Sequence, residues 1–216
     1  MENITFNMRD LHVHGTAFYD FLRLRKRFFV DTLGWHIPHD DDVEMDQYDN
    51  PKAWYSVVLR DGEVIGGARA MATTATWGSH SYMLRDAVQG KLIDIPAEVL
   101  AQDIVSPDMW ECTRLVISGA VDTQAARSTC LTMIVQGLID VAADQGATTL
   151  MSLSPLALMR ALRQLGFGAE RIGEPYVNDN DGRRYAVLSM PTTRIMPPLP
   201  RATHRVQPQP VHAPSV

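Results

Sequence analysis

The pair of residues that most constrains the fold is Asp61 and Gly62, which separates two strand-like runs, AWYSVVLR at 53–60 and EVIGGARAMA at 63–72. An Asp-Gly dipeptide in this setting favours the tight turn of a β-hairpin, since both turn positions accept a positive φ. We therefore predict an antiparallel hairpin over 53–72.

Periodicity and turn residues predict the elements around this hairpin. Apolar positions at three- and four-residue steps predict amphipathic helices over 17–33, ended by Gly34, and over 124–144, capped by Gly146. A further helix begins at Pro155 and runs to about 164, and strands are predicted at 109–117, 148–154 and 183–190. This order predicts an α/β or α+β sandwich whose first half is largely antiparallel.

Composition predicts one globular domain. The chain has 216 residues, of which 45% are apolar and 21% charged. We assign the domain to 1–193 and predict that the proline-rich segment 194–216 is a flexible tail. The net charge of −5 predicts no nucleic-acid partner. With no long apolar run and no signal-peptide pattern, we expect a cytoplasmic protein without a membrane partner.

Charged residues in or near the predicted strands are the main functional signal. Buried charges must pair, so charges from distant segments predict an ion network lining a cleft, which would suit a zwitterionic ligand. The candidates are Arg25, Asp46, Asp49, Arg69, Glu111 and Arg114. Regular strand pleating places Glu111 and Arg114 on opposite faces unless a bulge brings them together. The alternative, that each charge is solvated on an open strand face, stays open.

A calcium loop is the rival interpretation of the acidic segment. Such a loop needs a central glycine and a closing glutamate, and DDDVEMDQYDN at 40–50 lacks both. Cys112 and Cys130 have no metal-type spacing, so we expect free thiols. No metal site is predicted.

Four motifs resemble, in order and spacing, the signature positions of the acyl-homoserine lactone synthases, the autoinducer synthases of bacterial quorum sensing. They are RKRFFVDTLGW, EMDQYDN, GGARAM and WECTRLVI, and the resemblance extends from about Met8 to Pro191. That family is similar in fold to the GNAT N-acyltransferases. The resemblance therefore implies a mixed, mostly antiparallel sheet flanked by helices. Thr113 stands where many members have serine, a change that keeps the hydroxyl.

The resemblance also implies a reaction. S-adenosylmethionine is acylated by a thioester on acyl carrier protein or coenzyme A and then closes to an N-acyl-L-homoserine lactone, releasing methylthioadenosine. S-adenosylmethionine is a substrate here, so no cofactor is expected. Glu111 is expected to be the general base, with Arg114 and Asp46 in the catalytic set. The expected substrate-binding residues are Arg25, Phe29, Trp35, Asp49, Arg69 and Ser154.

Ser154 aligns approximately with a position that senses the acyl C3 substituent in the family. An apolar slot for the acyl chain is offered by Leu150, Met151, Leu153, Leu156 and Leu158, all of which could equally be core. Arg160, Arg163 and Arg171 suit an acidic carrier protein, or form an ordinary solvated face.

Two other functions are compatible with these residues. The first is an ordinary acyltransferase that uses acyl-CoA. In such enzymes a loop with small residues cradles the pyrophosphate at a helix amino terminus, and Arg127 and Thr129 replace the two small residues here. The second is a non-catalytic protein that binds adenosylmethionine or the carrier protein. A candidate general base, Glu111, favours an enzyme, because a binding protein needs none.

Overall fold

The predicted hairpin is present. In the computed structural model, which describes residues 1–194, β2 (Trp54–Arg60) and β3 (Glu63–Ala72) pair in antiparallel fashion. Asp61 and Gly62 join them with φ values of 54° and 83°. The turn therefore has the two positive φ values that the Asp-Gly dipeptide favours.

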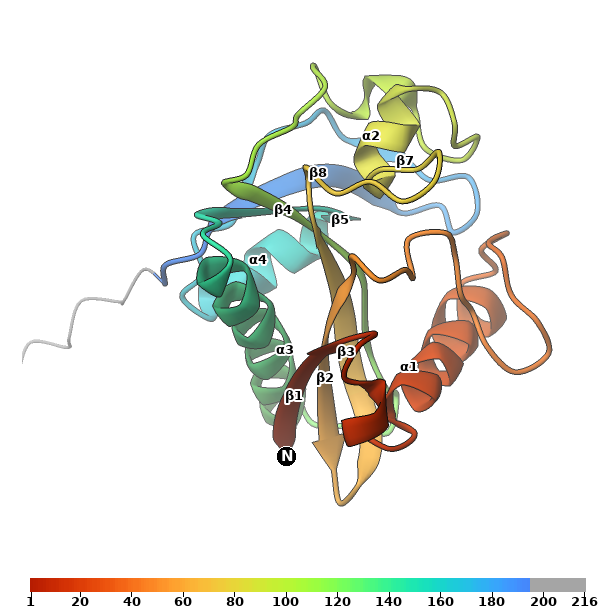
Figure 1. Ribbon diagram of the computed structural model, residues 1–216, viewed down its shortest axis with the longest axis vertical. Helices are drawn as coiled ribbons and strands as arrows, with labels where there is room; N and C mark the ends of the chain where they lie inside the picture. Colours follow the sequence, from red (N-terminus) through yellow and green to blue (C-terminus); the bar gives the residue numbers. More distant parts are fainter. Residues whose placement is uncertain (195–216) are drawn as a thin grey trace, which may run out of the picture.

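Eight strands form one sheet around this hairpin (Figure 1). Besides β2 and β3 they are β1 (Glu2–Asn7), β4 (Met109–Ile117), β5 (Thr149–Pro155), β6 (Glu170–Arg171), β7 (Tyr176–Val177) and β8 (Arg184–Pro191). Their order is β1-β2-β3-β4-β5-β8-β6, with β7 also paired to β8. Among the described strands only β4 and β5 pair in parallel. The mixed, mostly antiparallel sheet predicted from the sequence is confirmed.

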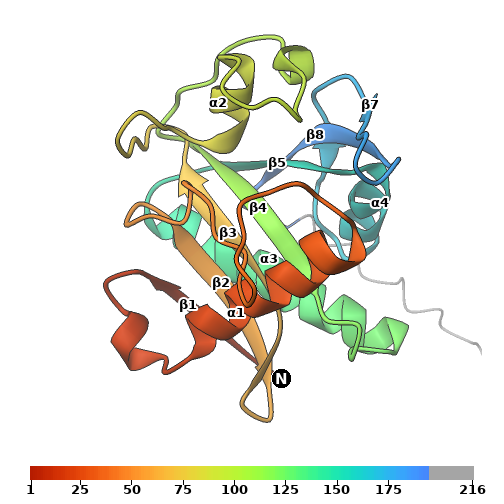
Figure 2. The same cartoon turned by 90° about the vertical axis from the view of Figure 1, so that its right-hand side faces the viewer.

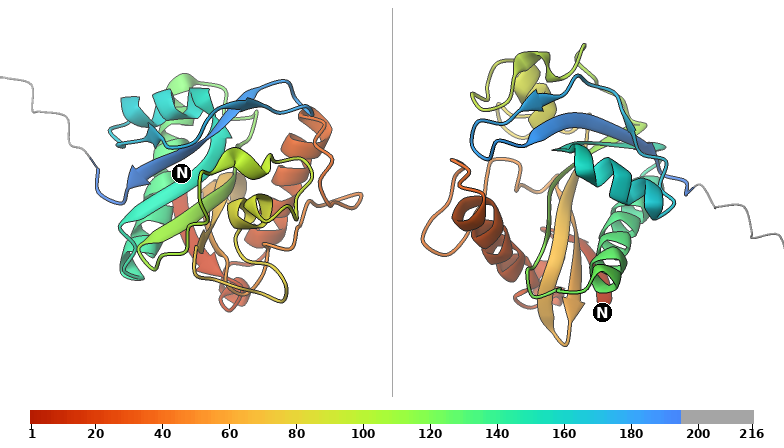
Figure 3. Two further views of the ribbon diagram at one scale, coloured as in Figure 1. Left: turned by 90° about the horizontal axis from the view of Figure 1, so that it is seen from above. Right: turned by 180° about the vertical axis from the view of Figure 1, so that it is seen from behind.

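Helices cover both faces of the sheet, as Figures 1 and 2 show. One face carries α1 (Ala17–Arg25) and α2 (Met83–Val88), and the other carries α3 (Gln124–Asp144) and α4 (Leu156–Gln164). There are also two short 3₁₀ turns, η1 (Leu11–Val13) and η3 (Ala97–Val99). Each face has its own apolar core, formed between the sheet and the helices that Figure 3 shows on its two sides.

Three local features differ from the sequence-based expectation. The sheet begins with β1, an edge strand in which only Phe6 is buried, so its sequence lacks a clear alternation. The six residues of α2 are too few to show a helical period. The helix expected over 17–33 is α-helical only to Arg25 and continues as a π-helix, η2 (Lys26–Thr32).

A β-bulge in β4 settles which way Arg114 points. Between the pairs Gly67 with Val116 and Arg69 with Thr113, β3 advances two residues while β4 advances three. Arg114 takes a φ of 57° at this extra position. Its side chain therefore reaches the face that carries α1, where it contacts Glu44 and Asp46. Of the two arrangements that the sequence leaves open, the structure therefore has the one in which a bulge brings Glu111 and Arg114 to the same face of the sheet.

Among residues 1–194, no helix is long and apolar enough to cross a membrane. The predicted tail, 194–216, lies outside the described residues apart from Arg194, which donates a hydrogen bond to the carbonyl of Leu165 at 2.6 Å.

Candidate active site

A cavity of about 670 Å³ opens where β4 and β5 separate. These strands pair over only three residue pairs, the last being Glu111 with Met151. Beyond that point both strands contribute to the cavity wall, through residues 112–115 and 152–155. Members of both apolar cores line it, such as Phe29 on the α1 side and Leu138 on the α3 side. The cavity thus passes through the sheet rather than lying on one face.

An ion network of three arginines and three carboxylates lies beside one end of the cavity. Arg25 is fully buried on α1 and donates from Nη1 and Nη2 to the two carboxylate oxygens of Asp49, both at 2.8 Å. Its Nε donates to Glu44 at 2.5 Å. Paired, parallel hydrogen bonds of this kind fix the orientation of both side chains.

The other two arginines complete the network. Arg69 donates to Asp46 at 2.6 Å, lies 2.8 Å from an oxygen of Asp49, and donates from Nε to the hydroxyl of Thr113. Arg114 donates to Asp46 at 2.8 Å and to Glu44 at 3.2 Å. Three positive and three negative charges therefore balance before any ligand binds, which is how a buried cluster avoids an uncompensated charge.

The arginines keep the acidic segment ionised. Burial alone would raise the pKa of Asp46, but the guanidiniums of Arg69 and Arg114 outweigh it and hold that pKa below its usual range. The pKa of Asp49 is lowered in the same way by Arg69 and Arg25. Glu44, which bridges Arg25 and Arg114, is not among the six charges singled out from the sequence; its position in EMDQYDN, two residues before Asp46, is the available signal.

Only part of this network reaches the cavity. Asp46 and Arg114 line it, whereas Arg25, Asp49 and Arg69 lie behind them. The structure thus brings five of the six predicted charges together, and it divides them into two that can touch a ligand and three that hold those two in place.

Glu111, the sixth, is placed differently. It forms no ion pair within the described chain, and its two oxygens accept hydrogen bonds from the backbone N–H groups of Met83 and Leu84, both at 2.8 Å. These groups begin α2. Burial raises the pKa of Glu111 from 4.5 to about 7, although the two N–H groups act in the opposite direction. Glu111 is also set back from the cavity, which is lined by its neighbour Cys112.

An aromatic wall lies beside Arg114. Phe29 and Trp35 pack with ring centroids 4.9 Å apart, and the guanidinium of Arg114 lies 5.6 Å from the centroid of Phe29. The indole N–H of Trp35 donates to Asp181 at 3.1 Å, and the hydroxyl of Tyr185 donates to the same oxygen. Asp181 and Tyr185 are not among the residues predicted from the sequence, because the contact between Trp35 and Asp181 spans 146 residues and leaves no local pattern.

The remaining predicted residues lie along β5 and α4. Ser154 lines the cavity, and its hydroxyl lies 2.9 Å from that of Ser152. Of the residues predicted for the acyl slot, all but Leu156 line the cavity, namely Leu150, Met151, Leu153 and Leu158. Within residues 1–194, no three His, Cys, Asp or Glu side chains are grouped so as to hold a metal ion.

The mixed sheet, opened between two parallel strands and covered by helices on both faces, has the GNAT-like N-acyltransferase fold. A family model described as autoinducer synthase matches residues 10–195. The chain belongs to the autoinducer synthase family, and it is therefore an acyltransferase.

Individual relatives agree with this assignment. The acyl-homoserine-lactone synthase of Acinetobacter nosocomialis is 35% identical over 168 residues, which cover 74% of this chain and 84% of that protein. The crystal structure of TofI in a ternary complex with an inhibitor and MTA has a TM-score of 0.69 at 24% identity, covering 89% and 92% of the two chains. BjaI, a CoA-dependent acyl-homoserine lactone synthase solved with SAM and isopentyl-CoA, has a TM-score of 0.70 at 18% identity, covering 88% and 82%.

Proposed function

We propose that this enzyme makes an N-acyl-L-homoserine lactone from S-adenosylmethionine and an acyl thioester, releasing methylthioadenosine. The observation that carries the proposal is the cavity through the sheet, which joins a charged end to an apolar end. Such a cavity can bring a zwitterion and a fatty acyl chain together from opposite faces. S-adenosylmethionine acts here as a substrate.

The charged end suits the amino-acid part of S-adenosylmethionine. Arg114 can pair with the carboxylate of the substrate, while Asp46 attracts its positive charges. The rings of Phe29 and Trp35 offer faces to the sulfonium, since a cation is attracted to an aromatic ring. Arg25, Asp49 and Arg69 bind the substrate indirectly, by fixing these two charged side chains.

Glu111 is the proposed general base. The substrate amine must lose a proton before it attacks, and a base with a pKa of about 7 is half ionised at neutral pH. Because Glu111 is set back from the cavity wall, we place one water between its carboxylate and the amine.

The neutral amine attacks the thioester carbonyl, so that the C–N bond forms, the C–S bond breaks and the departing thiolate takes up a proton. The carboxylate of the acylated product then attacks its own γ-carbon. This step closes the lactone, breaks the bond to sulfur and neutralises the sulfonium as methylthioadenosine leaves.

The acyl chain occupies the apolar end, and its thioester is carried by a protein. Ser152 and Ser154 lie in the wall where a polar substituent on the chain could be bound. At the start of α3, Arg127 donates to the carbonyls of Ser118 and Val121, so its side chain is engaged rather than free for a pyrophosphate. This favours acyl carrier protein over coenzyme A as the donor, and we propose that the reaction takes place in the cytoplasm.

The test is to incubate purified protein with S-adenosylmethionine and a panel of acyl-carrier-protein and acyl-CoA thioesters, followed by mass spectrometry. Acyl-homoserine lactone together with methylthioadenosine is the expected result, and the productive donor identifies the chain. An N-acylated product without methylthioadenosine would indicate an ordinary acyltransferase. Neither product, with S-adenosylmethionine still bound, would favour a non-catalytic binding protein.

A further inference from the structure

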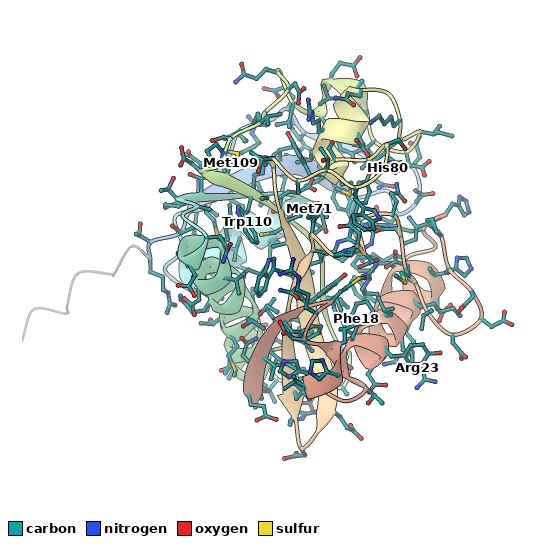
Figure 4. All side chains as sticks on the ribbon, in the orientation of Figure 1. Phe18, Arg23, Met71, His80, Met109 and Trp110 are labelled. Atoms are coloured by element: carbon teal, nitrogen blue, oxygen red, sulfur yellow. The ribbon has the colours of Figure 1, made fainter. Side chains whose placement is uncertain are left out.

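A second buried charge lies close to the ion network but outside it. Asp86 sits on α2 with no exposed surface. Its carboxylate accepts hydrogen bonds from the hydroxyl of Tyr48 at 3.1 Å, Nδ1 of His80 at 2.9 Å, the hydroxyl of Ser81 at 2.9 Å and Nζ of Lys91 at 3.1 Å. His80 is labelled in Figure 4, beside α2. The segments that immediately precede and follow α2, and Tyr48 of the acidic segment, are therefore all tied to this one side chain.

The carboxylate of Asp86 is ionised. Burial alone would raise its pKa, but hydrogen bonds from His80, Lys91 and Ser81 outweigh burial and lower it. A buried charge is costly unless it is fully paired. The side chains of Lys91 and His80 are 36% and 35% exposed, whereas that of Asp86 is fully buried. Asp86 is therefore the most firmly held side chain of this group.

Asp86 connects the two parts of the candidate site. The helix that carries it is only six residues long, and the N–H groups at its start hold both oxygens of Glu111. On its other side Asp86 holds Tyr48, whose own backbone N–H donates to Asp46 at 2.9 Å. A continuous chain of contacts therefore runs from Glu111 through α2, Asp86 and Tyr48 to Asp46.

We propose that Asp86 is a positioning residue that fixes Glu111 relative to Asp46, acting through α2 on one side and Tyr48 on the other. The inference rests on the proposed function, in which Glu111 removes a proton from a substrate held by Asp46. Misplacing a base by a fraction of a bond length slows proton transfer without weakening substrate binding. Loss of the Asp86 contacts should therefore affect turnover more than affinity.

The same contacts set how readily Glu111 accepts a proton. The N–H groups of Met83 and Leu84 favour its ionised form, so a loosened α2 allows its pKa to rise. The other ionisable groups around Glu111 are Arg69, Asp46, Tyr48, Tyr82 and Cys112. Replacing Asp86 removes none of these, so a change in titration would report the position of α2.

The experiment compares Asp86→Asn and the milder Tyr48→Phe, which removes one hydroxyl, with Asp103→Asn. Asp103 forms an ion pair, at 3.0 Å, with Arg85 of α2, but this pair lies at the surface. Asp103→Asn therefore removes a carboxylate that contacts the same helix and serves as a matched control. For Asp86→Asn and Tyr48→Phe we expect kcat to fall about tenfold and KM for S-adenosylmethionine to change less than about twofold. The acidic limb of the kcat/KM profile should move to higher pH. Asp103→Asn should match the wild type.

A carbon-13 NMR titration of the Glu111 carboxyl, assigned with Glu111→Gln, gives a readout that does not need turnover. In Asp86→Asn its midpoint should rise above that of the wild type. Wild-type kcat, pH profile and carboxyl titration in both variants would overturn the proposal. The proposal would also be overturned if the variants lost activity only in proportion to a lower Tm, with neither the pH profile of kcat/KM nor the NMR titration of Glu111 changed. A wild-type protein that releases no lactone contradicts the proposed function instead, and the NMR titration still decides whether Asp86 sets the state of Glu111.

Discussion

Replacing Arg25 with methionine tests whether the ion network holds the site together. Arg25 is fully buried and gives three hydrogen bonds to Glu44 and Asp49. Removing one partner of a buried ion pair costs about 3–5 kcal/mol, because it leaves an uncompensated charge. Asp49 keeps Arg69 at 2.8 Å and Glu44 keeps Arg114 at 3.2 Å, so we expect the lower end, about 3 kcal/mol.

Urea denaturation followed by circular dichroism at pH 7.5 measures this loss in the free energy of unfolding. For a chain of this size it corresponds to a Tm lower by roughly 6–12 °C. The control is Arg23→Met on the same helix, labelled in Figure 4, whose pair with Asp20 is 43% and 37% exposed. Such a surface pair contributes about 0–1 kcal/mol.

The pH dependence of the Arg25→Met effect follows from the carboxylates. Burial raises the pKa of Asp49, but Arg69 and Arg25 outweigh it and lower that pKa below its value in the unfolded chain. The stability this pairing provides is present above about pH 4 and is lost as the pH falls toward the folded-state pKa. The difference between wild type and variant should therefore shrink below about pH 4. A variant within 1 kcal/mol of wild type at pH 7.5 would refute this account of the network.

Three further changes test the site and the packing. Glu111→Gln should lower kcat by about 10²–10⁴-fold, while S-adenosylmethionine should still bind, as measured by calorimetry. In the wild type, kcat/KM should rise as the pH increases through about 7, because Glu111 then loses its proton and can act as a base. Ala161→Phe, in the apolar wall, should lower kcat/KM for long acyl donors more than for short ones in a competition assay read by mass spectrometry. Gly137→Ala would bring a Cβ too close to the Ser56 hydroxyl and to the amide oxygen of Asn3, the latter at 2.5 Å. We expect this overpacking to cost about 1–3 kcal/mol, more than the gain of about 1 kcal/mol in helix propensity. The midpoint of urea denaturation should therefore fall.

Those parts of the fold that could be predicted have local causes. Asp61 and Gly62 determine a turn by their own conformational preferences, and α3, with 21 residues, is long enough for buried apolar positions to recur at three- and four-residue steps. The charged residues could be predicted as a group because a charge in a strand-like segment needs a partner. In each case the signal is contained in a short segment or in the residue type itself.

The parts that could not be predicted depend on contacts between distant segments. The side-chain direction of Arg114 is set by a bulge against β3, and bulges have no reliable sequence pattern. The backbone partners of Glu111 come from a helix too short to show a period. The contact of Trp35 with Asp181 joins positions that are near only once β8 has been added to the sheet.

The bulge in β4 makes the number of residues in this strand as important as their identity. Deleting a single residue from 112–113 would restore a regular pleat and place Arg114 in the register position that Thr113 now holds, directly opposite Arg69. Two guanidiniums would then face each other across the pair of strands, which is destabilising. Inserting one residue there would shift the register of the rest of the strand by one position and so turn its side chains to the other face. A point substitution at these positions changes one contact, whereas a deletion or insertion of one codon changes which residues of β3 and β4 lie opposite each other. We therefore expect substitutions in β4 to be tolerated more readily than insertions or deletions.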